Sequence, residues 1–198
     1  KIIEPTLKST GGNIYYINMS FTALALGGSS FAQVQGKVGK NPSNVGDSAA
    51  FKSAFNTIQT LINGGHIVAG HDIGSGGLIT SLLEMNFADP KAGANFDLTS
   101  LGENDTIKLL FSENVGILFQ SKSGSESIIE DICRTASVLC HKIGSYQEGG
   151  IVNIQNNVNQ YTLNVGKWRD IWYKTSYLLD SKQSGEVKAK ERYDNYKN

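Results

Sequence analysis

The spacing of hydrophobic residues along the chain changes repeatedly between the period of a helix and that of a strand. Helical spacing is clearest over residues 48–62, where Asp47 can cap the N-terminus and Gly64-Gly65 ends the apolar run. Further helices are predicted over residues 29–38, 78–89, 106–111, 125–139 and 167–179. Strands are predicted over residues 14–17, 67–69, 94–98, 115–120, 140–146, 151–155 and 158–165, the last two joined by a tight turn at Asn156-Asn157.

This order of elements predicts an α+β fold, in which a mixed β-sheet carries helices on its faces. We expect one domain over residues 13–165, with a linker before it at 1–12 and a helix and linker after it at 166–198. Trp168 and Trp172 lie one turn apart on the last helix, and packing is the role we expect for them. Because the chain starts without methionine, we also expect it to be a piece of a longer polypeptide.

Charge and composition argue against several classes of function. Eighteen basic and eighteen acidic residues cancel, without a basic block, which argues against nucleic acid or an anionic membrane as the main partner. The sequence has no apolar run of membrane-spanning length and no signal-peptide pattern, so a cytoplasmic location is expected.

Two cysteines, Cys133 and Cys140, fall seven residues apart in a segment that starts helical. Two helical turns would separate them by roughly 10 Å, too far for a disulfide unless the helix ends between them. With His141 adjacent a zinc site is conceivable, but the paired ligand spacing of zinc sites is missing. We therefore expect buried, reduced thiols.

Candidate chemistry is concentrated in residues 66–85, HIVAGHDIGSGGLITSLLEM, which predict a buried strand, a polar turn and a helix. In such a turn, backbone N–H groups can approach a phosphate closely, and the helix N-terminus adds positive charge. Asp72, at the strand end, could bind Mg²⁺ beside phosphates. The alternative is that the glycines only satisfy the backbone, since the turn matches neither GxGxxG nor GK[ST]. The candidate phosphate-binding residues are Gly74, Ser75, Gly76 and Gly77.

Three ordered motifs carry a resemblance to a known family: LGGSSFAQV (26–34), AGHDIGSGGLITSLLEM (69–85) and LFSENVGILFQ (110–120). Together they resemble the C-terminal domain of the aminoimidazole ribonucleotide synthetase superfamily, and within it the phosphoribosylformylglycinamidine synthase family. The segment KWRDIWYKTSYLL (167–179) and the charged tail are similar to the part of the long, single-chain enzymes that leads from the second such domain toward a glutaminase domain.

The resemblance implies a fragment of a carbon–nitrogen ligase of purine synthesis that uses ATP, Mg²⁺ and ammonia from glutamine. In that family ATP phosphorylates an amide oxygen of formylglycinamide ribonucleotide, and ammonia then displaces the phosphate to give formylglycinamidine ribonucleotide. The fragment alone is expected to be inactive. It would contribute scaffold and part of a site for Mg²⁺ and ATP or ADP, which the remaining domains of the polypeptide would complete.

Carried over by motif, Asp72 becomes the Mg²⁺ ligand, and Gly74 stands where the family motif HDRSDGGL has a nucleotide-contacting serine. This sequence departs from that motif at Ile73, Gly74 and Ser75. The resemblance assigns no chemistry to Glu84 or Glu113.

Two alternatives stay open: a purely structural or docking module, and another ATP-dependent enzyme of the superfamily, such as aminoimidazole ribonucleotide synthetase. In either a fragment or a docking module, an exposed apolar face is expected where the missing domains pack.

Overall fold

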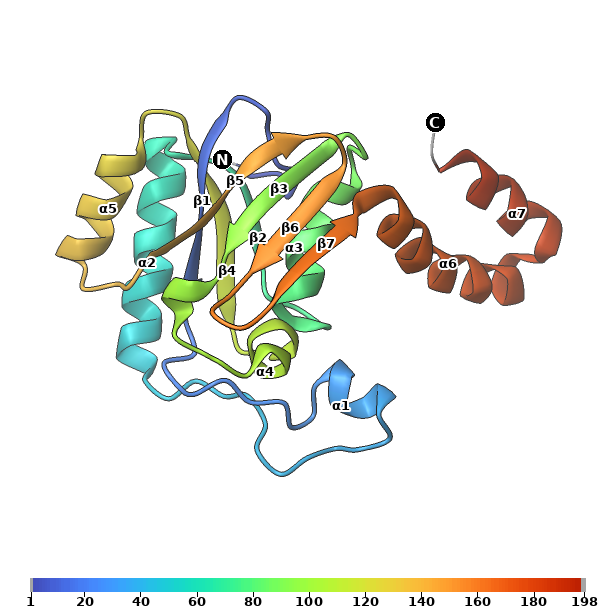
Figure 1. Ribbon diagram of the computed structural model, residues 1–198, viewed down its shortest axis with the longest axis horizontal. Coiled ribbons are helices and arrows are strands. Elements are labelled where there is room, and N and C mark those ends of the chain that lie inside the picture. The colour runs from blue at the N-terminus through green and yellow to red at the C-terminus, as the bar shows by residue number, and fades with distance from the viewer. Residues whose placement is uncertain (1, 197–198) are drawn as a thin grey trace.

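The computed structural model describes residues 2–196, which form one mixed seven-stranded sheet with helices on both faces (Figure 1). The strands lie in the order β2-β4-β1-β5-β3-β6-β7. Neighbouring strands are antiparallel except β3 and β6, which are parallel, so the predicted α+β class and mixed sheet are confirmed. The strands are β1 (Gly11–Asn18), β2 (Ile67–Asp72), β3 (Ala92–Asp97), β4 (Gly116–Lys122), β5 (His141–Glu148), β6 (Ile151–Gln155) and β7 (Gln160–Asn164).

The helices divide between the two faces of the sheet. α2 (Ser48–Gly64) and α5 (Glu126–Thr135) cover one face, and α3 (Gly77–Phe87) and α4 (Thr106–Phe111) cover the other. The short α1 (Ser30–Val34) and the 3-10 turn η1 (Thr99–Leu101) lie in connections. α6 (Val165–Ser184) and α7 (Glu186–Asn195) fold back on each other and project from the body as an arm (Figure 1).

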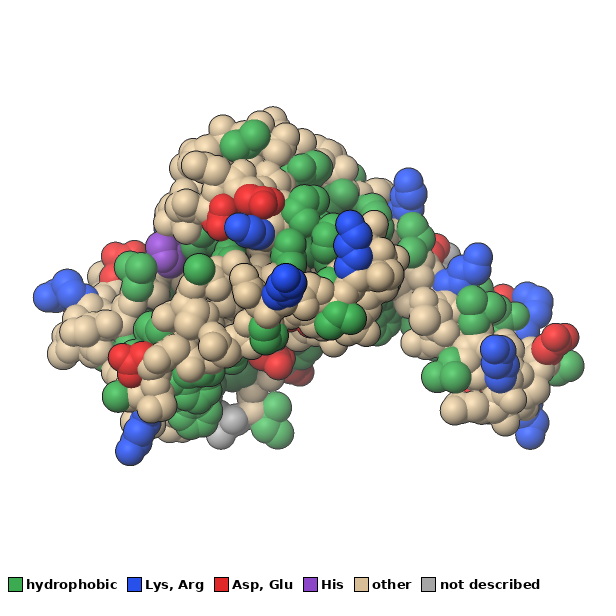
Figure 2. Space-filling model, turned by 90° about the horizontal axis from the view of Figure 1, so that it is seen from below, with side chains coloured by type: hydrophobic (Ala, Val, Ile, Leu, Met, Phe, Trp, Pro, Cys, Tyr) green, Lys and Arg blue, Asp and Glu red, His purple; other side chains and the backbone are tan. Residues whose placement is uncertain are grey.

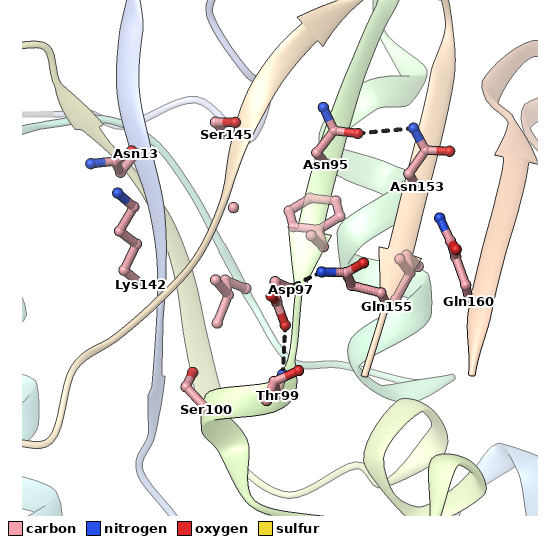
Figure 3. Close-up of a pocket in the computed structure, with 14 residues that line it drawn as sticks. Asn13, Asn95, Asp97, Thr99, Ser100, Lys142, Ser145, Asn153, Gln155 and Gln160 are labelled. Atoms are coloured by element: carbon pink, nitrogen blue, oxygen red, sulfur yellow. Dashed lines mark hydrogen bonds between the residues drawn. The ribbon is translucent and has the colours of Figure 1, made fainter. Parts of the chain in front are cut away.

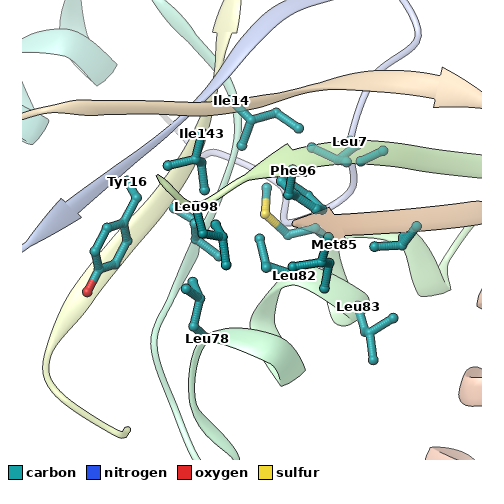
Figure 4. Packing of buried hydrophobic residues seen from close by; sticks show 14 of the residues in the cluster. Leu7, Ile14, Tyr16, Leu78, Leu82, Leu83, Met85, Phe96, Leu98 and Ile143 are labelled. Carbon is teal, nitrogen blue, oxygen red and sulfur yellow. The ribbon is translucent and has the colours of Figure 1, made fainter. Parts of the chain in front are cut away.

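Alternation along the central strand β1 feeds two hydrophobic cores. Ile14 and Tyr16 point toward α3, while Tyr15 and Ile17 point toward α2 and α5. Figure 4 shows the first core, where Leu82 and Met85 of α3 meet strand residues from across the sheet. Burying each such side chain contributes about 1.5–3 kcal/mol. The cores therefore hold α3, and with it the turn that precedes it, rigidly against the sheet.

The helix predicted from residue 48 is confirmed, together with its caps. The Asp47 side chain accepts hydrogen bonds from the N–H groups of Ala49 and Ala50, both at 2.9 Å. Gly65 ends the helix in the left-handed conformation, with φ of 77°.

Several predicted boundaries are wrong. The helix expected to reach residue 38 ends at Val34, and Gly36 follows in the left-handed conformation with φ of 67°. The helix expected to reach residue 139 ends at Thr135, because Ser137 adopts φ of 54° and turns the chain. The tight turn expected at Asn156-Asn157 is a four-residue loop over 156–159, because the Asn156 side chain accepts the N–H groups of Val158 and Asn159.

The ends of the chain are more structured than linkers. Leu7 is buried in the first core and β1 already begins at Gly11, ahead of the expected domain start at residue 13. At the other end α6 starts at Val165, and residues 186–195 of the tail form the surface helix α7. In the described part of the chain, no helix has the length and apolarity needed to cross a bilayer.

Candidate functional site

The turn between β2 and α3 presents its residues alternately to solvent and to the core. Asp72 ends β2 and has an 85% exposed side chain. Ile73 is buried and anchors the turn in the first core, while Gly74 and Ser75 are again exposed. The turn thus offers one exposed carboxylate, followed by two exposed residues, Gly74 and Ser75.

Glycine is required at some positions of this turn and not at others. Gly77 has φ of 75°, and a Cβ there would lie 2.7–2.8 Å from backbone atoms of Leu110 and Phe111. Gly76, at φ of 90°, precedes it in the same left-handed region. Gly74 has no such φ, and a Cβ there would meet no atom within 4 Å. Glycine at 76 and 77 therefore shapes the turn, whereas glycine at 74 leaves open space outside it.

Glu113 reaches the turn from the connection between α4 and β4. Its Oε1 accepts the Gly76 N–H at 2.7 Å and the Ser30 N–H at 2.8 Å. Burial acts to raise the pKa of Glu113, but these N–H donors and the Ser30 hydroxyl hold the pKa below its usual value. An ionised carboxylate therefore already occupies the N-terminus of α3.

The neighbouring Asn114 is fully buried and fixes a second loop. Its Oδ1 accepts the Ala25 N–H at 3.0 Å, and its Nδ2 donates to the Ser20 hydroxyl at 3.0 Å and the Ala23 carbonyl at 3.2 Å. The Glu113-Asn114 pair therefore joins the loop before α1 to the glycine turn.

His71 and Glu84 connect the turn to the projecting arm. His71 Nδ1 lies 2.6 Å from the Asp72 carbonyl oxygen, and Nε2 lies 3.1 Å from Glu84 Oε2. Both partners accept hydrogen bonds, an arrangement that favours the doubly protonated ring. The bond to Glu84 raises the pKa of His71, against the lowering effect of burial. Trp172 of α6 donates to Glu84 Oε1 at 2.9 Å and packs on Phe87, which confirms its packing role.

Asp72 is the only candidate metal ligand that the sequence placed in the turn, and in the structure its Oδ1 lies 3.5 Å from His71 Nδ1. Within residues 2–196, no three His, Cys, Asp or Glu side chains group closely enough to hold a metal ion by themselves. An exposed single carboxylate nevertheless suits Mg²⁺, which commonly takes one or two protein carboxylates and fills its other positions with phosphates and water.

Cys133 and Cys140 are free thiols, as expected, but their expected separation is wrong. Because α5 ends at Thr135, the chain turns back and the two thiols come within hydrogen-bonding reach. This contact raises the pKa of the Cys140 thiol, and burial acts in the same direction. Cys133 is buried and Cys140 half-buried.

Two of the hollows outside the turn differ in chemistry. The first, of about 860 Å³, is the open polar face of β3 and β6, where Asn95 bonds Asn153 and Asp97 bonds Gln155 (Figure 3). These side chains satisfy one another across neighbouring strands, as in a stabilising ladder.

The second hollow, of about 500 Å³, is an apolar groove between α3, α4, β7 and α6. Its exposed apolar residues include Ile107, Trp168 and Ile171. Figure 2 shows hydrophobic side chains gathered on the body, with the arm as a separate lobe. This groove is an exposed apolar face, as expected; that missing domains pack on it stays a prediction.

Sequence reasoning located the turn but not the residues that brace it. The structure places Asp72, Gly74 and Ser75 together on the outer side, with Gly76 and Gly77 at the start of α3. The contact of Glu113 with Gly76, 37 residues away, was not predicted. One sequence feature could have indicated this contact. The polar pair Glu113-Asn114 lies directly between a predicted helix and a predicted buried strand.

Comparison with known proteins agrees with this architecture. The family model described as "AIR synthase related protein, C-terminal domain" matches residues 10–156. The chain is 32% identical over 187 residues to "Probable phosphoribosylformylglycinamidine synthase, chloroplastic/mitochondrial" of Arabidopsis thaliana. That match covers 92% of this chain but only 13% of the relative, so the chain spans a small part of the relative's length.

Solved structures share the fold at low identity. "T. maritima PurL complexed with FGAR" matches with a TM-score of 0.66 and 18% identity, covering 85% of this chain and 29% of that chain. "T. maritima PurL complexed with ATP" matches with a TM-score of 0.62 and 16% identity, covering 83% and 27%. With the family model covering most of its length, the chain belongs to the family of AIR synthase related proteins, as their C-terminal domain.

Proposed function

We propose that this chain is a domain of a phosphoribosylformylglycinamidine synthase, a carbon–nitrogen ligase of purine synthesis that takes ammonia from glutamine. The 32% identity over 92% of the chain to the Arabidopsis relative carries this proposal. The short coverage of that relative supports the view that the remaining domains of a longer polypeptide complete the enzyme. The cytoplasmic location stays a prediction, and the relative itself is named as a chloroplastic/mitochondrial protein.

Within that enzyme, we propose that the turn forms half of a Mg²⁺–nucleotide site. Bound ATP would supply the phosphoryl group that makes an amide oxygen a good leaving group, and bound Mg²⁺ would neutralise phosphate charge. The exposed Asp72 carboxylate would hold the Mg²⁺, and the backbone N–H groups of the exposed Gly74 and Ser75 would bind phosphate oxygens. Gly76 and Gly77 would complete the phosphate-binding turn by setting its backbone conformation.

A calorimetric titration of Mg·ADP into the 198-residue chain tests the half-site. We expect a Kd weaker than about 100 µM, because one domain supplies only part of the contacts. Asp72→Ala should weaken binding further, whereas Asp131→Ala, an exposed carboxylate on α5, should not. Gly74→Ser should strengthen binding, because the position has room for a side chain and the hydroxyl adds a phosphate donor.

Three results would contradict the proposed half-site: no heat at millimolar Mg·ADP, binding that Asp72→Ala leaves unchanged, or a micromolar Kd for this domain alone.

A scaffold role is the second candidate, and the apolar groove favours it. A groove lined by Ile107, Trp168 and Ile171 is typical of a surface that packs against another domain. The two roles are compatible, because the groove and the outer side of the turn are lined by different residues.

A further inference from the structure

Glu113 places a negative charge where the turn would otherwise receive an anion. One carboxylate oxygen accepts N–H groups from the N-cap of α3 and from the first residue of α1. The backbone of Glu113 is held as well, because the Ser43 hydroxyl donates to its carbonyl oxygen at 3.1 Å. The carboxylate is therefore a fixed part of the turn.

The segments that form the turn and carry Glu113, residues 66–85 and 110–117, contain no lysine or arginine that would offset this charge. Asp72 adds a second carboxylate. The N-terminus of α3 offers about half a positive charge, which the Glu113 carboxylate already neutralises. The ring of His71, which precedes Asp72, is engaged by Glu84, by the Asp72 carbonyl and by the Asp72 carboxylate.

Resting on the nucleotide role proposed above, we propose that Glu113 is a positioning residue that makes the turn selective for phosphate carried with a divalent cation. Its hydrogen bonds to the N–H groups of Gly76 and Ser30 fix the backbone conformation of the turn. Its negative charge repels a phosphate that carries no metal ion. A phosphate that arrives with Mg²⁺ brings the positive charge that the turn lacks, and Asp72 stands ready to share that ion.

Inorganic pyrophosphate without metal is the direct probe, in the presence of a chelator. Binding to the 198-residue chain is followed by the NMR signals of the amides of residues 74–77. Glu113→Gln keeps an oxygen that can accept from Gly76 and Ser30 but removes the charge. We expect it to bind metal-free pyrophosphate roughly threefold to tenfold more tightly than the parent chain. With saturating Mg²⁺ that difference should shrink.

Two further variants separate charge from geometry. Glu126→Gln removes a carboxylate from the first turn of α5 and should leave pyrophosphate binding unchanged. Glu113→Asp keeps the charge but is too short to reach both N–H groups, so it should disturb the amides of Gly76 and Ser30 without any gain in affinity. Equal metal-free affinities of Glu113→Gln and the parent chain would overturn the proposal, as would the absence of a pyrophosphate response in both.

These experiments distinguish a failure of the proposed role of Glu113 from a failure of the proposed nucleotide site. If ADP binds neither chain but Glu113→Gln still gains pyrophosphate affinity, the nucleotide role fails and the role of Glu113 in anion selection stands. If Mg·ADP binds and pyrophosphate does not distinguish the two chains, the role of Glu113 fails and the nucleotide role stands.

Discussion

Gly74 and Gly77 lie three residues apart in one turn but have very different surroundings. The sequence pattern indicated a glycine-rich turn before a helix, which the structure has, but it treated its glycines alike. Which of them the fold requires depends on Leu110 and Phe111, whose backbone lies against Gly77. Such contacts between segments distant in the chain leave no trace in local spacing.

Gly77→Ala should destabilise the fold by about 2 kcal/mol or more, because alanine is strained at this φ and its Cβ meets backbone atoms that cannot easily move. Gly74→Ala is the matched control and should change the free energy of unfolding by less than about 0.5 kcal/mol. Urea unfolding followed by circular dichroism measures both. A similar loss of unfolding free energy in the two variants would contradict the conclusion that the fold requires glycine at 77 but not at 74.

The free energy of unfolding should also depend on pH through Glu113. Its pKa is lower in the folded state than in the unfolded chain, so its stabilising effect is complete above the unfolded pKa and is lost as the pH falls through the folded pKa. In acid, the free energy of unfolding of the parent chain should therefore fall more steeply than that of Glu113→Gln. Parallel pH profiles of the two chains below pH 5, measured by urea unfolding, would count against this effect.

At the scale of elements, the sequence predicted α2 with both its caps, because Asp47 and Gly65 act within one turn of the helix ends. It overextended α5, since residues 136–139 continue an apolar pattern while Ser137 turns the chain out of the helix. It also predicted the wrong turn between β6 and β7, because the Asn156 side chain can accept hydrogen bonds two and three residues ahead. Local propensity therefore located the elements, and side-chain hydrogen bonds set their ends.

The position of α6 depends on few contacts with the body, so single changes should loosen it. Trp172→Ala removes the bond to Glu84 and the packing on Phe87, and it should cost about 1–2 kcal/mol because the side chain is only half-buried. Hydrogen exchange should accelerate in α6 and remain slow in β1 and β4. Leu178→Ala, farther along α6 and 52% exposed, serves as the control and should leave exchange near α3 unchanged. Uniform acceleration through the sheet would contradict this local role.

At the scale of the whole molecule, the mixed sheet and its helical layers followed from the order of predicted elements. The strand order did not, because sequence spacing says nothing about which strands pair. The sequence predicted that an exposed apolar surface exists but not where it lies. The groove could not be located because α3, α4, β7 and α6 contribute to it from separate parts of the chain.

The groove predicts that the isolated chain associates with itself at high concentration. Sedimentation velocity should show dimers or larger species that diminish when Ile107 and Ile171, which are 42% and 50% exposed in the groove, are both changed to Glu. Val187→Glu, on α7 away from the groove, should not reduce association. A strict monomer at high concentration would contradict the prediction that this groove drives self-association.

The central position of β1 has a consequence for how the chain acquires its fold during synthesis. β1 ends at Asn18, but its two neighbours, β4 and β5, begin only at Gly116 and His141. A nascent chain therefore carries β1 without either partner until β4 has been synthesised, and with one side unpaired until β5 follows. Such distant pairing makes folding slow and keeps an apolar strand exposed meanwhile. Chains that stop before His141 would retain one open side of β1 and should be prone to aggregation.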